Sequence, residues 1–220
     1  MEEHASLDTI LTHDDDKDDL AARIVALVGS RLCHDLISPL GAIGNGVELL
    51  QMTGSWPGLD QSPEMVLIND SLRSARARIT CFRMAFGAAG DTQRVPPAEL
   101  ADLIRDMERA GRLQITLDAE GDQARRTVKL LLLSLMCLET AIPWGGRVGI
   151  VQNGRHWELT ATAERTRQDP ALWSWLNGLR PGLVNPAAAE VHFPLLSLTA
   201  SEMKRRLHWS LDETTVRIFF

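Results

Sequence analysis

Residues 62–86 read SPEMVLINDSLRSARARITCFRMAF, and they predict a long amphipathic helix. Apolar residues recur there at alternating spacings of three and four, which is the a/d pattern of a helix that packs along a narrow seam. The seam consists of Met65, Ile68, Leu72, Ala75, Ile79, Phe82 and Phe86. Ser62 and Pro63 occupy the N-cap and first helical positions, which favours a helix that begins here. Such a narrow seam needs another helix to cover it.

A second helix precedes this one, and we expect it to run from Asp19 to Met52. With about 100° of rotation per residue, its apolar residues form a stripe along one side. The stripe consists of Val25, Leu32, Leu36, Ile43 and Leu50. A short loop joins the two helices, so we predict an antiparallel hairpin. One hairpin leaves apolar surface uncovered, and we therefore expect two copies to pair as a homodimeric four-helix bundle.

His34 lies on the side of the first helix that is opposite the apolar stripe. Its neighbours on that side are small or polar, so a partner surface can reach the imidazole; they are Ser30, Ser38, Gly41 and Asn45. Asp35 follows directly, and it is placed either to orient the ring or to take its proton. The pattern predicts a reactive or phosphate-carrying histidine, and the alternative is a histidine that is merely structural or solvated.

Three further residues border this side of the helix. Leu27 and Ile37 flank it and are candidates to anchor an apolar patch of a partner. Arg31 either neutralises phosphate charge or is a solvated arginine without a special role.

Composition excludes several classes of protein. The net charge of −6 provides no electrostatic footprint for nucleic acid. Cys33, Cys81 and Cys137 lie far apart, which fits neither a disulfide framework nor a zinc site. The longest apolar run, residues 130–133, is too short to span a membrane, and the N-terminus does not have the pattern of a signal peptide. We expect a cytoplasmic protein without membrane or nucleic-acid partners.

The chain divides into three predicted segments. Residues 1–18 form a disordered acidic tail, residues 19–88 form the helical hairpin, and residues 89–220 form an α/β sandwich, so the fold class is α+β. In the third segment we expect a helix from Pro97, a strand over 113–117, a helix over 125–141, a β-hairpin over 147–151 and 157–161, helices over 171–179 and 199–206, and a closing strand over 215–220.

Residues 34–40, His-Asp-Leu-Ile-Ser-Pro-Leu, resemble the phosphoacceptor helix of two-component histidine kinases, with its H-[DE]-x-x-x-P pattern. The longer stretch over residues 32–50 is similar to a narrower family, the ChpT-type histidine phosphotransferases of the alphaproteobacterial cell-cycle phosphorelay. This resemblance implies a dimeric bundle in which each subunit carries a degenerate, kinase-like ATPase domain. It also implies that His34 accepts a phosphoryl group from the receiver domain of a hybrid kinase (CckA-like) and passes it to response regulators (CtrA-like and CpdR-like), with Mg²⁺ held by the receiver.

The nucleotide site of a kinase is missing from this sequence. When Pro143-Trp144-Gly145-Gly146 is aligned with the P-x-G-G that follows the asparagine-bearing helix of kinases, Leu133 and Cys137 fall where the two asparagines belong. Neither side chain offers the hard oxygen that Mg²⁺ prefers. We therefore expect no bound cofactor and no phosphorylation from ATP. Two alternatives remain: a dimeric scaffold that binds receiver domains while His34 stays unphosphorylated, and a histidine kinase with an unrecognised nucleotide site.

Overall fold

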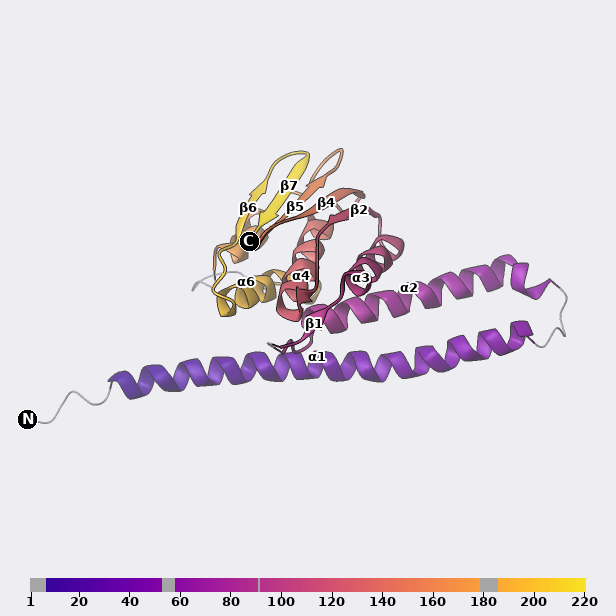
Figure 1. The fold of residues 1–220 in the computed structure, drawn as a ribbon, viewed down its shortest axis with the longest axis horizontal. Helices are drawn as coiled ribbons and strands as arrows, with labels where there is room; N and C mark the ends of the chain where they lie inside the picture. The colour runs from indigo at the N-terminus through magenta and orange to yellow at the C-terminus, as the bar shows by residue number, and fades with distance from the viewer. Residues whose placement is uncertain (1–6, 53–57, 91, 179–185) are drawn as a thin grey trace, which may run out of the picture.

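The computed structural model describes residues 7–52, 58–90, 92–178 and 186–220. Its most extended feature is a hairpin of two antiparallel helices, α1 (Leu7–Met52) and α2 (Pro63–Phe86), as Figure 1 shows. A short 3₁₀ helix, η1 (Leu59–Gln61), precedes α2. The Ser62 hydroxyl caps α2 by accepting a hydrogen bond of 3.2 Å from the Met65 amide. The predicted hairpin and its cap are confirmed.

The first helix begins at Leu7 instead of Asp19. Residues 7–18, which we expected to belong to a disordered tail, are therefore part of α1, and residues 1–6 lie outside the described part of the chain. A physical reason favours the longer helix: extending an existing helix is much easier than nucleating a new one.

The seam of α2 is less buried than its spacing predicts. Met65 is buried, but Ile68 is exposed and Leu72, Ala75, Ile79, Phe82 and Phe86 are only half-buried. The other buried positions of α2 are Ala77, Cys81, Met84 and Ala85. The reason is that α2 has two partners: it packs on α1 with one side and on α3 and α4 with another.

A mixed sheet and its covering helices form the C-terminal domain. The helices are α3 (Pro97–Ala110), α4 (Arg125–Ala141), α5 (Pro170–Trp173) and α6 (His192–Glu202), with short 3₁₀ helices η2 (Ser174–Asn177) and η3 (Ala188–Glu190). Within the described residues the main sheet has five strands in the order β2-β4-β5-β7-β6. Their bounds are Leu113–Asp118 (β2), Gly146–Asn153 (β4), His156–Thr162 (β5), His208–Leu211 (β6) and Thr215–Phe219 (β7). The pair β2–β4 is parallel and the other pairs are antiparallel. Two short strands, β1 (Arg94–Val95) and β3 (Gln123–Ala124), pair separately.

The helices α3, α4 and α6 lie between this sheet and the hairpin (Figure 1). The core centres on α4, where Leu130, Leu131, Leu132 and Leu133 are all fully buried. Because α4 is apolar nearly all round, it is enclosed between the sheet, α6 and α2. The α+β fold class, with a helical hairpin followed by an α/β sandwich, is confirmed.

Most predicted elements of this domain are present, and two predictions are wrong. Residues 171–179 do not form one helix, because α5 ends at Trp173, a 3₁₀ turn follows, and Gly178 leaves it with a φ of 101°. The helix predicted over 199–206 instead begins at His192 and ends at Glu202. The strand β6 and the short strands β1 and β3 were not predicted.

Three cations at the start of α4 connect the hairpin to the C-terminal domain. Arg125 Nη2 donates to the Arg83 carbonyl (3.3 Å), Arg126 Nε to the Ala89 carbonyl (3.4 Å), and Lys129 Nζ to the Gly87 carbonyl (3.1 Å). These carbonyls belong to the last turn of α2 and the segment that follows it. Cations are favourable at the C-terminal end of a helix, so α4 supplies a cap that fixes how α2 enters the domain.

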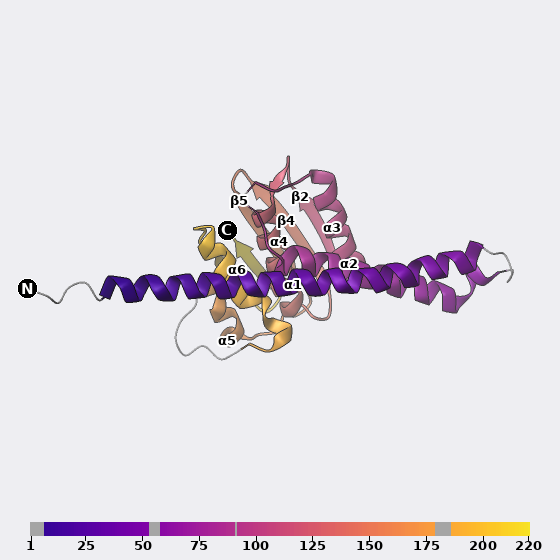
Figure 2. The ribbon, with the colours of Figure 1, turned by 90° about the horizontal axis from the view of Figure 1, so that it is seen from below.

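Figure 2 shows α1 from below, extending past the domain at both of its ends. Among the helices of the described residues, none has both the length and the apolar composition required to cross a membrane.

Candidate functional site

The imidazole of His34 lies on the surface of α1, and 80% of the side chain is exposed. The next residue, Asp35, is its polar partner, since His34 Nδ1 lies 3.1 Å from Asp35 Oδ1. On the other carboxylate oxygen, Asp35 accepts a hydrogen bond of 2.7 Å from Arg31 Nε, one turn earlier. Both hydrogen bonds lower the pKa of Asp35, and the bond from His34 has the larger effect.

This arrangement decides which nitrogen of His34 has an available lone pair. An ionised carboxylate only accepts hydrogen bonds, so Nδ1 must carry the proton that Asp35 receives. In the neutral ring the lone pair is then on Nε2, the nitrogen that faces away from Asp35. His34 therefore presents a nucleophilic Nε2, and Asp35 holds the ring in the tautomer that makes it so.

The residues predicted to line the docking side of α1 are largely accessible. Leu27, Arg31, Ser38 and Asn45 are exposed, and Ile37 and Gly41 are half-buried. A Cβ added at Gly41 would meet no atom within 4 Å, so the surface there is open. The side chain of Ser30 lies outside the described residues. Arg31 is engaged with Asp35, which gives it a role in holding the carboxylate.

In the described part of the chain, the opposite side of α1 carries exposed apolar side chains. Leu32, Leu36, Ile43 and Leu50 are between 45 and 59% exposed. The side chain of Val25, the remaining member of the predicted stripe, lies outside the described residues. Among the positions of α1 whose side chains the structure describes, the buried ones are Cys33, Gly44 and Val47. His34 and the apolar stripe thus occupy separate sides of the helix, as the helical wheel predicts.

A contact that the sequence did not predict joins the two helices beyond Pro39. Arg76 of α2 donates from Nη2 to the carbonyls of Leu40 (3.2 Å) and Gly41 (3.5 Å) in α1. Gly44 makes this possible, because a Cβ there would overlap the Arg76 guanidinium. The only signal in the sequence is a glycine inside a long helix, which often marks a close approach.

The positions that correspond to the asparagines of a kinase are inaccessible. Leu133 and Cys137 are fully buried in α4, and burial raises the pKa of the Cys137 thiol well above its usual range. An isobutyl group and a neutral thiol provide no oxygen ligand, so these residues do not fit Mg²⁺ or the nucleotide phosphates that it accompanies. In the described part of the chain, no three His, Cys, Asp or Glu residues cluster closely enough to hold a metal ion.

This chain is similar to phosphotransferases both in sequence and in fold. Residues 97–215 match the family described as the histidine phosphotransferase C-terminal domain. The protein phosphotransferase ChpT of Brucella abortus (strain 2308) is 30% identical over 195 residues, which cover 86% of this chain and 91% of the relative. A solved structure described as a bacterial phosphotransferase superposes with a TM-score of 0.65 at 28% identity, covering 91% of this chain and 95% of that one. The histidine kinase domain of Erythrobacter litoralis EL346 is more distant, with a TM-score of 0.41 at 15% identity over 89% of this chain and 93% of that one.

The family match covers more than half of the chain, and the similarity to ChpT extends over most of both proteins. At 195 residues, this similarity extends beyond residues 97–215, which the family model matches. The chain therefore belongs to the ChpT-type histidine phosphotransferases.

Proposed function

We propose that this protein relays a phosphoryl group through His34, between a receiver domain of a hybrid kinase and the receiver domains of response regulators. The observation that carries the proposal is the exposed His34 ring, whose Nδ1 is bonded to Asp35 and whose Nε2 is free. The donor and acceptor would be CckA-like and CtrA-like or CpdR-like proteins, as the resemblance to the family implies.

The chemistry requires little from this chain beyond position and tautomer. The lone pair of His34 Nε2 attacks the phosphorus of an aspartyl phosphate, the bond from phosphorus to the aspartyl oxygen breaks, and the aspartate leaves as a carboxylate. The proton stays on Nδ1, so the phosphorylated ring carries a positive charge that the neighbouring Asp35 carboxylate offsets. In the second transfer a carboxylate oxygen of another receiver attacks the phosphorus, and the electron pair of the N–P bond returns to Nε2. The receiver domains would supply the Mg²⁺.

We further propose that the working form is a homodimer. A second copy is the simplest cover for Leu32, Leu36, Ile43 and Leu50, which are apolar, contiguous along α1 and exposed in the single chain. Because this stripe is opposite His34, pairing through it would leave the histidine accessible to receiver domains.

A three-part labelling experiment tests the relay. The purified protein is incubated with labelled ATP alone, then with a receiver domain that carries labelled phosphate, and the second incubation is repeated with His34→Ala. His208→Ala serves as the matched control, because His208 is also exposed but lies in the sheet. We expect label only from the receiver, no label on His34→Ala, and normal label on His208→Ala.

The remaining outcomes identify the alternatives. Label acquired from ATP alone would mean a histidine kinase with an unrecognised nucleotide site. No label under either condition would leave a scaffold that binds receivers without being phosphorylated. Either result would overturn the relay.

A further inference from the structure

A pocket of about 310 Å³ lies where the hairpin meets the C-terminal domain. Residues from four parts of the chain line it: Phe82 on α2, Met107 on α3, Met136 and Glu139 on α4, and Ala189 and His192 near the start of α6. Its size is at the lower end of the range for pockets that hold small organic ligands. A molecule bound there would touch the hairpin and the domain at once.

The walls of the pocket favour an aromatic ring. Phe82, Met107 and Met136 are half-buried, so part of each side chain faces the space between the helices. Methionine sulfur is polarisable and makes favourable contacts with aromatic rings, while its flexible chain adapts to their outline. Cys81 adds a further apolar surface, because burial raises the pKa of its thiol to about 12 and keeps it neutral.

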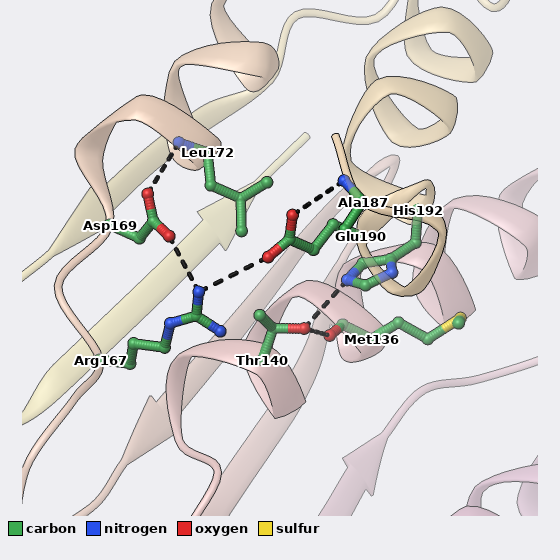
Figure 3. A network of polar contacts seen from close by, with 8 residues as sticks. All are labelled: Met136, Thr140, Arg167, Asp169, Leu172, Ala187, Glu190 and His192. Carbon is green, nitrogen blue, oxygen red and sulfur yellow. Dashed lines mark hydrogen bonds and ion pairs between the residues drawn. The ribbon is translucent and has the colours of Figure 1, made fainter. Parts of the chain in front are cut away.

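One side of the pocket carries hydrogen-bond acceptors. The Glu139 carboxylate is 3.6 Å from Arg78 Nη2, which is an ion pair too long for a strong hydrogen bond, so its oxygens retain accepting capacity. Deeper in, Thr140 Oγ1 donates to the Met136 carbonyl (3.0 Å) and lies 3.1 Å from His192 Nε2, as Figure 3 shows. Burial lowers the pKa of His192 to about 4, so the ring is neutral at pH 7. Thr140 and His192 satisfy one another, so the Glu139 carboxylate is the group that suits a ligand with N–H donors.

The pocket does not suit a nucleotide triphosphate. The positions where kinases hold the Mg²⁺-bound phosphates, Leu133 and Cys137, are fully buried and are not among the lining residues. Arg78 is the one cationic side chain among the described lining residues, and Glu139 already offsets its charge. Because the charges of Arg78 and Glu139 offset each other, a compact, uncharged or weakly cationic molecule fits the pocket better than a phosphate.

We propose that this pocket binds a small planar aromatic heterocycle, whose ring lies against Phe82, Met107 and Met136 and whose adjacent N–H groups donate to the Glu139 carboxylate. Binding here does not depend on phosphotransfer at His34.

The Ala188–Ala189 pair allows a sharp test. Both alanines are exposed in η3, but only Ala189 lines the pocket. The probe is 2-aminobenzimidazole, which presents two adjacent N–H donors on a flat ring, and benzimidazole is the matched probe without the amino group. Binding to the full-length protein is followed by amide chemical-shift changes in NMR titrations.

We expect saturable binding of 2-aminobenzimidazole with a Kd on the order of 1 mM, which is typical of a ligand of this size. Ala189→Leu should weaken it about tenfold by filling the pocket, whereas Ala188→Leu should leave it unchanged. Glu139→Gln and the use of benzimidazole should each weaken it by roughly tenfold, because each removes the charge-assisted pair. Unsaturable shifts, or equal affinity in the Ala189→Leu and Ala188→Leu proteins, would overturn the proposal.

Discussion

Nδ1 of His34 is bonded to Oδ1 of Asp35 across 3.1 Å, between consecutive residues of α1. Consecutive residues of a helix point about 100° apart, so this contact exists only because both side chains turn toward each other on the surface. It fixes the tautomer of the one histidine that the family resemblance marks as the phosphoacceptor. The account of function depends on this pair.

Asp35→Asn should slow phosphoryl transfer to His34 about 10- to 100-fold, because an amide no longer selects the Nδ1-protonated ring. The helix should be unaffected, since Asp35 is exposed. Rapid-quench measurement of transfer from a phosphorylated receiver domain gives the rate. Arg31→Gln is the control: it keeps the Asp35 carboxylate but removes the 2.7 Å hydrogen bond from Arg31 Nε. It should slow the transfer less than Asp35→Asn does. Transfer at the native rate in Asp35→Asn would contradict the role of the pair.

The Asp35–His34 pair should also be visible in a pH titration. The pKa of Asp35 is lowered in the folded protein, chiefly by His34, so the pair persists below the ordinary aspartate value and is lost only as the pH falls through the lower, folded value. The carboxyl ¹³C shift of Asp35 reports this titration directly. A midpoint at or above that of an aspartate in an unstructured peptide would show that the bond is absent.

His192 should make the protein less stable in mild acid. Its pKa falls from 6.5 to about 4 on folding, because burial disfavours the charged ring. Between these values the unfolded chain binds a proton that the folded chain does not, so stability decreases as the pH drops from 6.5 toward 4, by about 3 kcal/mol in total. Urea unfolding at several pH values measures the effect. His192→Gln should remove this part of the pH dependence, and an unchanged pH dependence in that variant would contradict the assignment.

Gly41 and Gly44 should respond differently to alanine. Gly41→Ala meets open space and should stabilise α1 by about 0.5–1 kcal/mol, the usual gain for replacing a helical glycine. Gly44→Ala displaces the Arg76 guanidinium from the Leu40 and Gly41 carbonyls, so part of that gain should be lost. In the Arg76→Gln background the two substitutions should become equivalent. Thermal unfolding of the four proteins measures the coupling, and the same difference in both backgrounds would rule out the Arg76 contact as its cause.

The exposed stripe of α1 predicts how the protein assembles. Ile43→Glu places a charge in the stripe and should convert a dimer to a monomer, as measured by light scattering. Asn45→Glu, two residues along on the His34 side, should leave the dimer intact and weaken binding of a receiver domain. A native protein that is monomeric at high concentration, or a dimer that survives Ile43→Glu, would contradict pairing through the stripe.

Local signals in the sequence predicted the elements that depend on neighbouring residues. The turn at Asn153-Gly154 marks the β4–β5 hairpin, and the breakers at Pro143-Trp144-Gly145-Gly146 follow the end of α4. The start of α6 escaped prediction because Pro194 reads as a helix breaker, although proline is tolerated in a first turn where its missing N–H has no partner. Strand β6 pairs only with β7 at the edge of the sheet, and that long-range contact has no local signature.

The same distinction applies to the site. The exposure of His34 and its separation from the apolar stripe follow from helical periodicity, and the Asp35 contact follows from adjacency. The Arg76 side chain contacts carbonyls that lie 36 and 35 positions earlier in the chain. The pocket beside Glu139 is lined by four distant parts of the chain. Neither is visible until the hairpin and the C-terminal domain are packed together.

If Nε2 of His34 receives the phosphoryl group from a receiver domain, NMR of protein labelled with ¹⁵N in its histidines should show where the phosphorus is bonded. After incubation with a phosphorylated receiver domain and Mg²⁺, we expect a phosphorus–nitrogen coupling to Nε2 of His34, with the proton retained on Nδ1. A coupling to Nδ1, phosphate on another residue, or no phosphohistidine at all would contradict this expectation.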